Sequence, residues 1–463
     1  MTRGEISGRI DVNFWRLSPL FHERFSHPRY PAVPLGTIVE LVQYGCSSRA
    51  TETPIGVPML RMNNLQNDGW DLRDLKFISM EEEELARYRL EFDDLLFNRT
   101  NSKDLVGKCD VFRETGDWVF ASYLIRVRLD TATVLPQFAS YFLTTPAGRL
   151  QIDRLSRQII GMTNINAEEL KDILIPLPPR AGRQQDLVVA MDLAREERRA
   201  KLAEAEALIT DLSQNFMAML GLDIPARDSR KTFAVRLDEL LGRKIGVGLY
   251  SPALKGFLGT LSQSPFPTNR LGMEAEINPA VDLSALADDS SVSFIPMDAV
   301  ENNAAGGVIL ETRALSEVRK GYTPFAEGDV LWAKITPCME NGKSCIARNL
   351  TSGIGFGSTE FHVLRPASER VTAEYLYEFV SQAELRSIAR FAFTGSAGHQ
   401  RVPSEFLADL PFPVPPLDIQ EKIAFEARQR RAEARRLRAE AEAGWEAAKR
   451  WFEEQLLGPF PEA

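Results

Sequence analysis

The chain repeats itself, and this repeat constrains its fold more than any other feature of the sequence. The segment Ile175-Pro176-Leu177-Pro178-Pro179 returns later as Phe412-Pro413-Val414-Pro415-Pro416. Each proline-rich segment is followed by a long stretch without proline, rich in Ala, Glu, Arg and Leu, and these stretches end at Leu220-Gly221 and Leu457-Gly458. Proline breaks helices and glycine often ends them, so both stretches are predicted to be long helices.

The repeat extends through both halves of the chain. Asp94-Leu95-Leu96-Phe97-Asn98-Arg99 aligns with Asp329-Val330-Leu331-Trp332-Ala333-Lys334, and Gly107-Lys108 aligns with Gly342-Lys343. After a short insertion in the second half, Ala121-Ser122 aligns with Ser358-Thr359 and the proline-rich segments coincide. Most of the aligned residues differ. We therefore expect a tandem duplication in which two copies of one architecture act on different targets.

Apolar residues in the two long helices recur every three or four positions, which is the spacing of a coiled-coil seam. A mostly polar helix of this length is not stable alone, and the other helix is its most economical partner. The alternative is that each helix stays solvated and packs on its own domain. The predicted seam consists of Leu202, Ile209, Leu212 and Phe216 in the first helix and Ile423, Leu437 and Trp451 in the second.

Outside the long helices the pattern is mixed α and β. Short apolar runs such as Leu124 to Leu129 are bounded by turn residues, which is typical of strands. Asn166-x-x-Glu169 predicts a capped short helix, and Asp418-x-x-Glu421 predicts the start of the second long helix. We predict an α+β fold with two tandem-repeated α/β domains, each followed by a long helix, the two helices pairing as an antiparallel coiled coil. The predicted limits are 1–180 for the first domain, 181–221 for its helix, 222–417 for the second domain and 418–458 for its helix.

Composition limits the environment of the protein. With 463 residues, of which 44% are hydrophobic, the chain has enough apolar material for more than one core. No stretch has the length of a signal-peptide core or a membrane span. The four cysteines are scattered and form no metal-ligand spacing with the four histidines. We therefore expect a cytoplasmic protein with reduced thiols and no bound metal.

Motifs for catalysis and cofactor binding are missing. Gly342-Lys343-Ser344 resembles the end of a phosphate-binding loop, but Pro337 stands where the first glycine of that loop belongs. Asn278-Pro279-Ala280-Val281 lacks the second proline and the aromatic residue of an amino-methyltransferase loop. We expect a chain that is not an enzyme and binds no cofactor.

Short polar clusters occupy aligned places in the two halves. Amide, hydroxyl, guanidinium and ammonium groups read base edges and bind phosphates, so these clusters are predicted to contact DNA. Two observations oppose this: the net charge of −9 disfavours nucleic acid mildly, and Asn, Gly and Ser also build tight turns. The candidate DNA-binding residues are Asn98, Arg99, Asn101, Ser102, Lys103, Lys108, Thr163, Asn164, Lys334, Thr336, Asn341, Lys343, Ser358, Thr359, His399, Gln400 and Arg401.

These features together resemble the specificity subunit of type I restriction-modification enzymes. The resemblance rests on Leu96-Phe97-Asn98-Arg99-Thr100-Asn101-Ser102 with Val106-Gly107-Lys108, on residues 170–179 and 406–420, and on the two helices, so it covers nearly the whole chain. It implies two target-recognition domains, each reading one half of a split double-stranded DNA sequence, held apart by a coiled coil. It also implies partner subunits that act on DNA: adenine methyltransferase subunits that use S-adenosylmethionine and restriction translocase subunits that use ATP.

The sequence departs from this family in places. The family tends to place Glu-Gln after the proline-rich segment; the second copy keeps Gln420, but the first has Arg183 at the aligned place, which predicts a different docking of the first segment. Two other functions stay open. A cytosolic coiled-coil scaffold with two protein-binding domains would not show salt-dependent binding of duplex DNA. A methyltransferase with unrecognised motifs would bind S-adenosylmethionine as an isolated chain.

Overall fold

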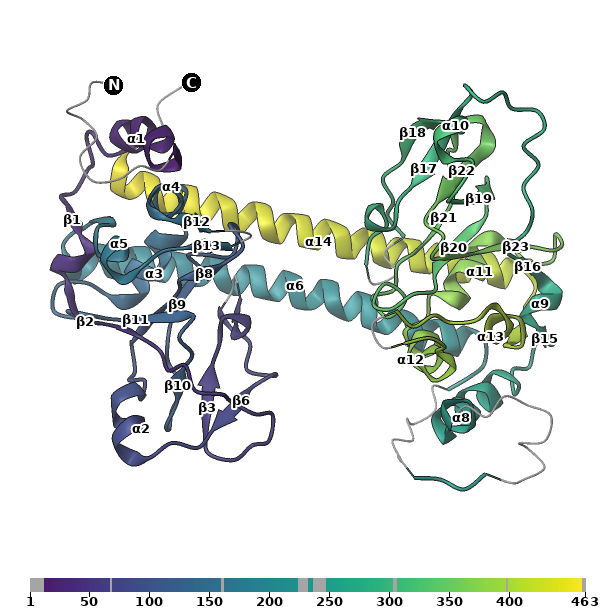
Figure 1. Cartoon of the computed structure of the whole chain (residues 1–463), viewed down its shortest axis with the longest axis horizontal. Coiled ribbons are helices and arrows are strands. Elements are labelled where there is room, and N and C mark those ends of the chain that lie inside the picture. Colours follow the sequence, from purple (N-terminus) through teal and green to yellow (C-terminus); the bar gives the residue numbers. More distant parts are fainter. Residues whose placement is uncertain are drawn as a thin grey trace. The chain divides into compact units, whose positions relative to one another are not determined.

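The computed structural model describes residues 12–66, 69–159, 162–223, 232–235, 247–302, 306–396 and 399–459. The chain forms two compact units: the first is Met1–Ala203 with Arg438–Ala463, and the second is Glu204–Leu437. Both combine helices and strands, as the sequence predicts (Figure 1). The divisions fall inside two long helices, α6, Gln185–Met219, and α14, Leu417–Leu457. Each unit therefore holds a globular part and a segment of both helices, and the predicted domain limits stay a prediction.

The first unit is built on a four-stranded antiparallel sheet in the order β2-β11-β7-β9. The sheets β10-β3-β6, β12-β13-β8, β4-β5 and β1-β14 surround it. The elements of this globular part are α1 Val12–Arg24, β1 Ala32–Pro34, β2 Val39–Tyr44, β3 Val57–Leu60, β4 Leu65–Gln66, β5 Gly69–Trp70, β6 Lys76–Ile78, α2 Glu82–Tyr88, β7 Leu95–Asn98, β8 Thr100–Asn101, β9 Cys109–Val111, β10 Val119–Phe120, β11 Leu124–Leu129, α3 Pro136–Thr144, α4 Pro146–Leu155, β12 Arg157–Ile159, β13 Met162–Asn164, α5 Ala167–Lys171 and β14 Leu174–Pro176.

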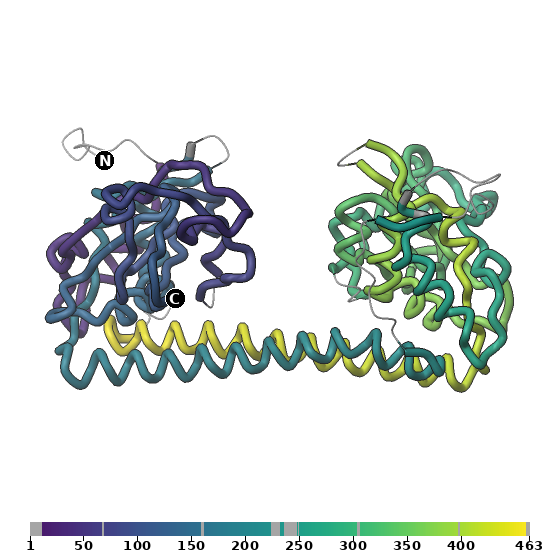
Figure 2. The backbone as a smooth tube through the Cα atoms, turned by 90° about the horizontal axis from the view of Figure 1, so that it is seen from below, coloured from purple at the N-terminus to yellow at the C-terminus, as the bar shows by residue number. Residues whose placement is uncertain are grey.

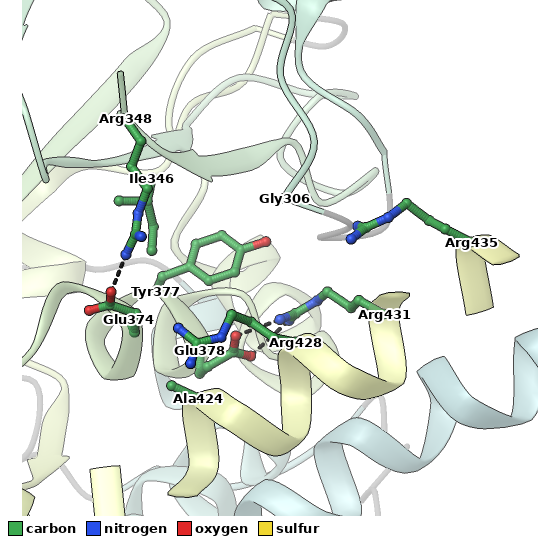
Figure 3. A pocket seen from close by; sticks show the side chains of 10 residues that line it. All are labelled: Gly306, Ile346, Arg348, Glu374, Tyr377, Glu378, Ala424, Arg428, Arg431 and Arg435. Atoms are coloured by element: carbon green, nitrogen blue, oxygen red, sulfur yellow. Dashed lines mark hydrogen bonds and ion pairs between the residues drawn. The ribbon is translucent and has the colours of Figure 1, made fainter. Parts of the chain in front are cut away.

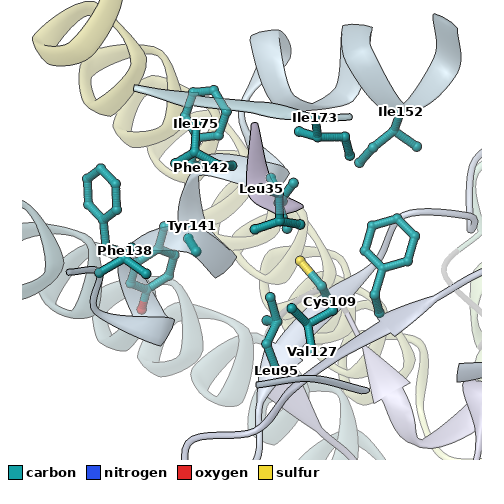
Figure 4. Packing of buried hydrophobic residues seen from close by; sticks show 14 of the residues in the cluster. Leu35, Leu95, Cys109, Val127, Phe138, Tyr141, Phe142, Ile152, Ile173 and Ile175 are labelled. Atoms are coloured by element: carbon teal, nitrogen blue, oxygen red, sulfur yellow. The ribbon is translucent and has the colours of Figure 1, made fainter. Parts of the chain in front are cut away.

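The core of the first unit lies between the four-stranded sheet and helix α3. This helix starts at Pro136, a position where the missing amide hydrogen costs nothing, and all but one of its side chains are buried. Leu95, Cys109 and Val127 of the sheet belong to the same apolar cluster as Phe142 of α3 (Figure 4). Each fully buried large side chain of this kind contributes about 1.5–3 kcal/mol. Strand β7, which ends at Asn98, therefore packs directly on this apolar core.

The second unit repeats this plan with the four-stranded antiparallel sheet β16-β23-β20-β21. A second sheet, β18-β17-β22-β19, and the pair β15-β24 complete it. The elements of this globular part are η4 Val247–Tyr250, α8 Pro252–Leu261, β15 Thr268–Arg270, α9 Leu271–Glu274, β16 Ala275–Ile277, β17 Ser291–Ile295, β18 Glu311–Ala314, α10 Leu315–Val318, β19 Thr323–Ala326, β20 Val330–Ala333, β21 Ser344–Ile346, β22 Ile354–Gly357, β23 Phe361–Pro366, α11 Ala373–Val380, α12 Ala383–Ala389, η7 Arg390–Ala392, α13 Ser404–Ala408 and β24 Pro411–Pro413.

A buried ion pair recurs at the same place in both units. Asp94, which is 1% exposed, accepts hydrogen bonds from Nε and Nη2 of Arg128 at 2.8 and 3.1 Å. Asp329, also 1% exposed, accepts bonds from the same two atoms of Arg365, both at 2.7 Å. In each copy the aspartate precedes the strand that leads to the polar cluster. The residues that the alignment of the two halves pairs are therefore structurally equivalent at this position.

Segments of the two long helices contact each other inside each unit (Figures 1 and 2). In the first unit, Arg198 Nη2 of α6 donates to Glu442 Oε1 of α14 at 2.6 Å. In the second unit, Ala205 of α6 packs with Ala434 and Leu437 of α14. Small side chains let helices approach closely. Near the helix ends, Arg183 before α6 donates to Gln455 late in α14 at 2.6 Å in the first unit, and Asn215 late in α6 donates to Glu426 early in α14 at 2.8 Å in the second.

The predicted seam is partly wrong in its residues. Trp451 is 40% exposed, whereas its neighbour Phe452 is fully buried and packs with Trp445 on the core of the first unit. The buried stripe of α14 therefore continues through Trp445 and Phe452, and Phe452 lies one position beyond the predicted Trp451. Ile209 and Leu437 do contact the other helix in the second unit.

The remaining seam residues have other roles or are only half-buried. Phe216 is buried, but its ring stacks on Tyr375 of α11 with ring centroids 6.0 Å apart, so it joins the helix to the globular part. Ile423 belongs to the same apolar cluster. Leu202 and Leu212 are half-buried. One face of each helix thus serves both the other helix and a globular core.

A buried glutamine fixes the start of each long helix. Oε1 of Gln420 accepts a hydrogen bond from the amide of Thr372 at 3.0 Å, and Nε2 donates to the carbonyls of Arg370 and Pro415. Gln184 makes the same three contacts in the first unit, with the amide of Leu135 and the carbonyls of Thr133 and Pro178. Both glutamines are 0% exposed. The expectation that the first copy lacks this residue is wrong.

The first glutamine is displaced by one residue, and the backbone shows why. A π-type turn, Arg180–Gln184, precedes α6, and Gly182 within it has φ +84°, a left-handed conformation that glycine adopts without strain. The extra residue makes Arg183 appear to replace the glutamine. The predicted helix start at Asp418 is also wrong, because α14 begins at Leu417 and the carboxylate lies inside the first turn. The cap predicted at Asn166 is confirmed by its bond from the amide of Glu169 at 2.8 Å.

Candidate nucleic-acid interface

Two polar segments that are far apart in the sequence meet at the edge of the first unit. β13 pairs with β8, so Thr163 lies opposite Asn101. The backbone of Arg99 is held on both sides: its amide donates to the carbonyl of Tyr123 at 3.1 Å, and its carbonyl accepts from the amide of Ile165 at 3.0 Å. This backbone arrangement places Arg99 beside Tyr123, and the side chain of Arg99 reaches that of Asn164. We call these three residues the first cluster.

The first cluster presents a cation, an amide and a phenol. The guanidinium of Arg99 lies 4.7 Å from the ring centre of Tyr44, and its Nη2 reaches Oδ1 of Asn164 at 3.4 Å. Asn164 in turn donates from Nδ2 to the hydroxyl of Thr100. Tyr123 is 50% exposed. Stacking and hydrogen bonding limit the rotamers of the arginine and the asparagine, which lowers the entropy that binding would otherwise cost.

The second unit holds a matching cluster on the same backbone frame. The amide of Lys334 donates to the carbonyl of Glu360 at 2.9 Å, and its carbonyl accepts from the amide of Val402 at 2.9 Å. Arg401 lies beside them through its backbone bridge to Ile335. We call Lys334, Glu360 and Arg401 the second cluster. In the alignment of the two halves, they occupy the places of the residues of the first cluster.

The electrostatics of the second cluster are different. Arg401 donates to both carboxylate oxygens of Glu360, from Nε at 2.8 Å and from Nη2 at 2.6 Å. These hydrogen bonds lower the pKa of Glu360. Partial burial lowers the pKa of Lys334; the charge of Glu360 opposes this shift and the charge of Arg401 adds to it. The second cluster therefore carries two cations and one carboxylate, whereas the first has one cation and no carboxylate.

Three of the predicted DNA-binding residues are structural. Asn98 is 1% exposed, and its Nδ2 donates to the carbonyl of Leu105 at 3.0 Å, which shapes the loop after β7. Thr163 is 4% exposed within β13. Lys343 donates from Nζ to the carbonyls of Met297 and Val300 at 2.9 and 2.7 Å. The prediction is wrong for the two buried side chains, and the ammonium of Lys343 is already engaged; the turn-building alternative fits all three.

The other predicted residues outside the two clusters are exposed or half-buried. Ser102, Lys103, Asn341, Thr359 and His399 are exposed. A second group is half-buried: Asn101, Lys108, Thr336, Ser358 and Gln400.

Two of these half-buried residues share a cavity in the second unit. Thr336 donates from its amide to the carbonyl of Gln400 at 2.9 Å, and both line a cavity of about 690 Å³. The same cavity is lined by Arg390 and Glu340, which form an ion pair at 2.8 Å.

Sequence reasoning missed Tyr123 and Glu360. Both directly follow an aligned pair that it did use, Ala121-Ser122 in the first half and Ser358-Thr359 in the second. Neither residue has an unusual local pattern. The signal that could have found them is the alignment itself, because the next aligned position carries a phenol in one copy and a carboxylate in the other.

A basic cavity of about 220 Å³ lies between α11 and α14 of the second unit (Figure 3). Arg431 donates to both oxygens of Glu378 at 2.5 and 2.7 Å, and both side chains are less than a tenth exposed. Burial raises the pKa of Glu378, and the charge of Arg431 opposes that shift. Arg348 pairs with Glu374 on the other side of the cavity. This network fixes α14 to the globular part of its unit.

Other kinds of site are not found in the part of the chain that the structure describes. No group of three or more His, Cys, Asp and Glu side chains could hold a metal ion there. All four cysteines are free thiols, and three of them are buried. Within the same ranges, no helix is long and apolar enough to cross a membrane.

Comparison with known proteins gives consistent results. Residues 275–425 match the family model of the type I restriction modification DNA specificity domain. The EcoAI specificity subunit of Escherichia coli is 46% identical over 150 residues, which cover 32% of this chain and 25% of that subunit. The EcoEI specificity subunit of the same species is 40% identical over 149 residues, with the same coverage of both chains. The match therefore spans about a quarter of the length of these relatives. Among solved structures, the S subunit of a type I restriction-modification system from M. genitalium is 12% identical, with 94% of this chain and 97% of that chain covered and a TM-score of 0.42.

Proposed function

Because the chain belongs to the type I restriction-modification specificity subunits, whose DNA specificity domain it carries at residues 275–425, we propose that it is the subunit that selects the DNA sequence on which a restriction-modification complex acts. It has no catalytic role of its own. Each unit reads one half of a bipartite, asymmetric target in double-stranded DNA. S-adenosylmethionine and ATP bind to partner subunits, a DNA adenine methyltransferase and a restriction translocase.

One observation carries this proposal. The two units hold three side chains each on equivalent backbone positions, and the chemistry differs: Arg99, Tyr123 and Asn164 in one, Lys334, Glu360 and Arg401 in the other. A shared frame with different donors and acceptors is what two readers of different base sequences require. A scaffold that bound one protein partner twice would instead keep the same side chains at both places.

The long helices suit a role as a spacer between the two readers. We propose that they pair along their length as an antiparallel coiled coil, an arrangement supported by the contacts of Arg198 with Glu442 in the first unit and of Ala205 with Ala434 in the second. The predicted domain limits follow from the same proposal. The length of the paired helices would set the number of unread base pairs between the half-sites.

Single substitutions in the clusters test the reading function. Arg99→Ala and Lys334→Ala should each weaken binding of the assembled complex to its target by about 1–3 kcal/mol if the side chain contacts a guanine. Each should relax selection in one half-site only. Arg73→Ala, which changes a 90% exposed arginine, is the control. Binding to random-sequence libraries, sequenced after selection, measures both effects; duplex binding without any sequence preference in the wild-type complex would contradict the proposed function.

Helix length tests the spacing function. One heptad inserted after Ala207 in α6 and one after Ala432 in α14 lengthens the pair by about 10 Å and keeps the seam in register. The preferred gap between half-sites should grow by roughly three base pairs, at about 3.4 Å each, with both half-site sequences unchanged. The insertion also rotates one half-site about the duplex, so some affinity is lost at every spacing. A complex that still prefers the original gap would contradict the spacer role.

A further inference from the structure

The carboxylate of Glu360 is the one acidic group among the six side chains of the two clusters. It is 22% exposed and its two oxygens accept from Arg401, whose side chain is 42% exposed. A carboxylate on a surface that binds DNA is repelled by phosphates, so this position is unfavourable for a residue that only contacts the DNA backbone. It is favourable for a residue that reads a base edge.

The hydrogen-bonding groups of Glu360 and Arg401 match one kind of base pair. A carboxylate only accepts hydrogen bonds, and in the major groove the donors are the amino groups of cytosine and adenine. An arginine donates in a fork, and guanine presents two acceptors on that edge. Arg401 binds Glu360 through Nε and Nη2, and its Nη1 donates to the carbonyl of His399 at 3.1 Å. One N–H on each of Nη1 and Nη2 therefore remains beside the carboxylate. A cytosine and its paired guanine therefore offer one donor and two acceptors side by side.

We infer that Glu360, together with Arg401, selects a C·G base pair in the half-site read by the second unit. Glu360 accepts from the cytosine amino group and Arg401 donates to the guanine. The carboxylate also rejects the opposite orientation, G·C, and the pair T·A, because guanine or thymine would face it with acceptors. This inference rests on the proposed function and adds to it the base pair and the two residues that choose it.

In the first unit the equivalent backbone positions carry no carboxylate, so a different base pair is expected there. Tyr123 stands in the place of Glu360 and Asn164 in the place of Arg401. Asparagine pairs with adenine through one donor and one acceptor, so the first half-site should contain an adenine at the equivalent position. The two half-sites are thus expected to differ at this position in a way that the side chains dictate.

The test compares specific and non-specific binding in the complex of the chain with its methyltransferase subunits. Glu360→Gln should lower the preference for C·G at one position of the second half-site about tenfold, which corresponds to one lost selective contact. The same change removes a negative charge near the phosphates, so binding to non-specific duplex should become tighter. Asp288→Asn is the matched control, since Asp288 pairs with Arg319 on the surface of the same unit.

The two readouts move in opposite directions only if Glu360 faces a base. A purely structural carboxylate would weaken both specific and non-specific binding when changed. Unchanged selection at every position, or a sensitive position that is not C·G in the wild-type target, would overturn the inference. Those results leave the proposed function intact if Arg99→Ala still alters the other half-site, whereas a wild-type complex without sequence preference refutes both.

Discussion

The two units fix their long helix at the same place by different chemistry. In the second unit Glu378 of α11 forms a buried ion pair with Arg431 of α14. In the first unit the aligned residue of α3 is Tyr141, whose hydroxyl donates to Asp192 of α6 at 2.5 Å. At the aligned position a hydrogen bond therefore replaces the ion pair, and the ion pair that joins α6 to the first globular part is formed instead by Arg195 of α6 and Asp110 of β9 at 2.6 Å. The energetic consequences of losing the contact at the aligned position should differ between the units.

The largest effect is expected from breaking the ion pair. Glu378→Ala leaves the guanidinium of Arg431 buried without its partner, which should lower the free energy of unfolding of the second unit by about 3–5 kcal/mol. Replacing both residues by leucine should recover most of that loss, because two apolar side chains need no partner. Urea-induced unfolding followed by circular dichroism measures both. A double variant as unstable as the single one would contradict this account.

Loss of the buried glutamine contacts should destabilise the protein less than loss of the ion pair. The cost in unfolding free energy should be the same in both units. Gln184→Ala and Gln420→Ala each leave a buried amide and two carbonyls without a partner, at a cost of about 1–3 kcal/mol. Hydrogen exchange of the first turns of α6 and α14 locates the change.

A deletion separates the glutamine contact from the turn that precedes it. Removing Gly182 places Gln184 at the same distance from the proline-rich segment as Gln420 in the second unit. The deletion should therefore cost less stability than Gln184→Ala. If it costs more, the π-type turn itself stabilises the unit.

The hydrogen bond in the first unit should matter less than the ion pair in the second. Tyr141→Phe removes only the hydroxyl, and Asp192 is not buried, so water replaces the lost partner. The expected loss in unfolding free energy is about 1 kcal/mol. A loss as large as that of Glu378→Ala would show that the two contacts are energetically alike.

The smallest expected effect is a dependence on pH that only the second unit shows. His362 in β23 aligns with Ile125 in β11, and burial lowers the pKa of the histidine. A lowered pKa means that the folded state favours the neutral ring, so stability is complete above the usual pKa of about 6.5 and falls as pH decreases below it. Unfolding at pH 7.5 and 5.5 should show this loss, and His362→Ile should reduce it. If the wild type and His362→Ile lose the same free energy of unfolding between pH 7.5 and 5.5, the histidine is not the cause.

The sequence by itself determined the duplication, the mixed α and β character, the two long helices and the resemblance to the specificity subunits. Each follows from patterns that local chemistry imposes: proline cannot continue a helix, and a repeated order of apolar runs repeats a fold. The strand at Leu124 to Leu129 and the cap at Asn166 were found because their signals lie within a few residues.

Only the tertiary structure decided which polar residues are free to act. Asn98 and Lys343 have the composition of DNA contacts, yet both bind carbonyl groups of distant or neighbouring loops. The residues around Glu360 form no motif that indicates a functional role, yet the fold places its carboxylate against Arg401. Side-chain burial and pairing depend on residues far along the chain, and a pattern of neighbours cannot reveal them. For the same reason the sequence missed Gln184, since a single inserted residue hid a contact that the backbone restores.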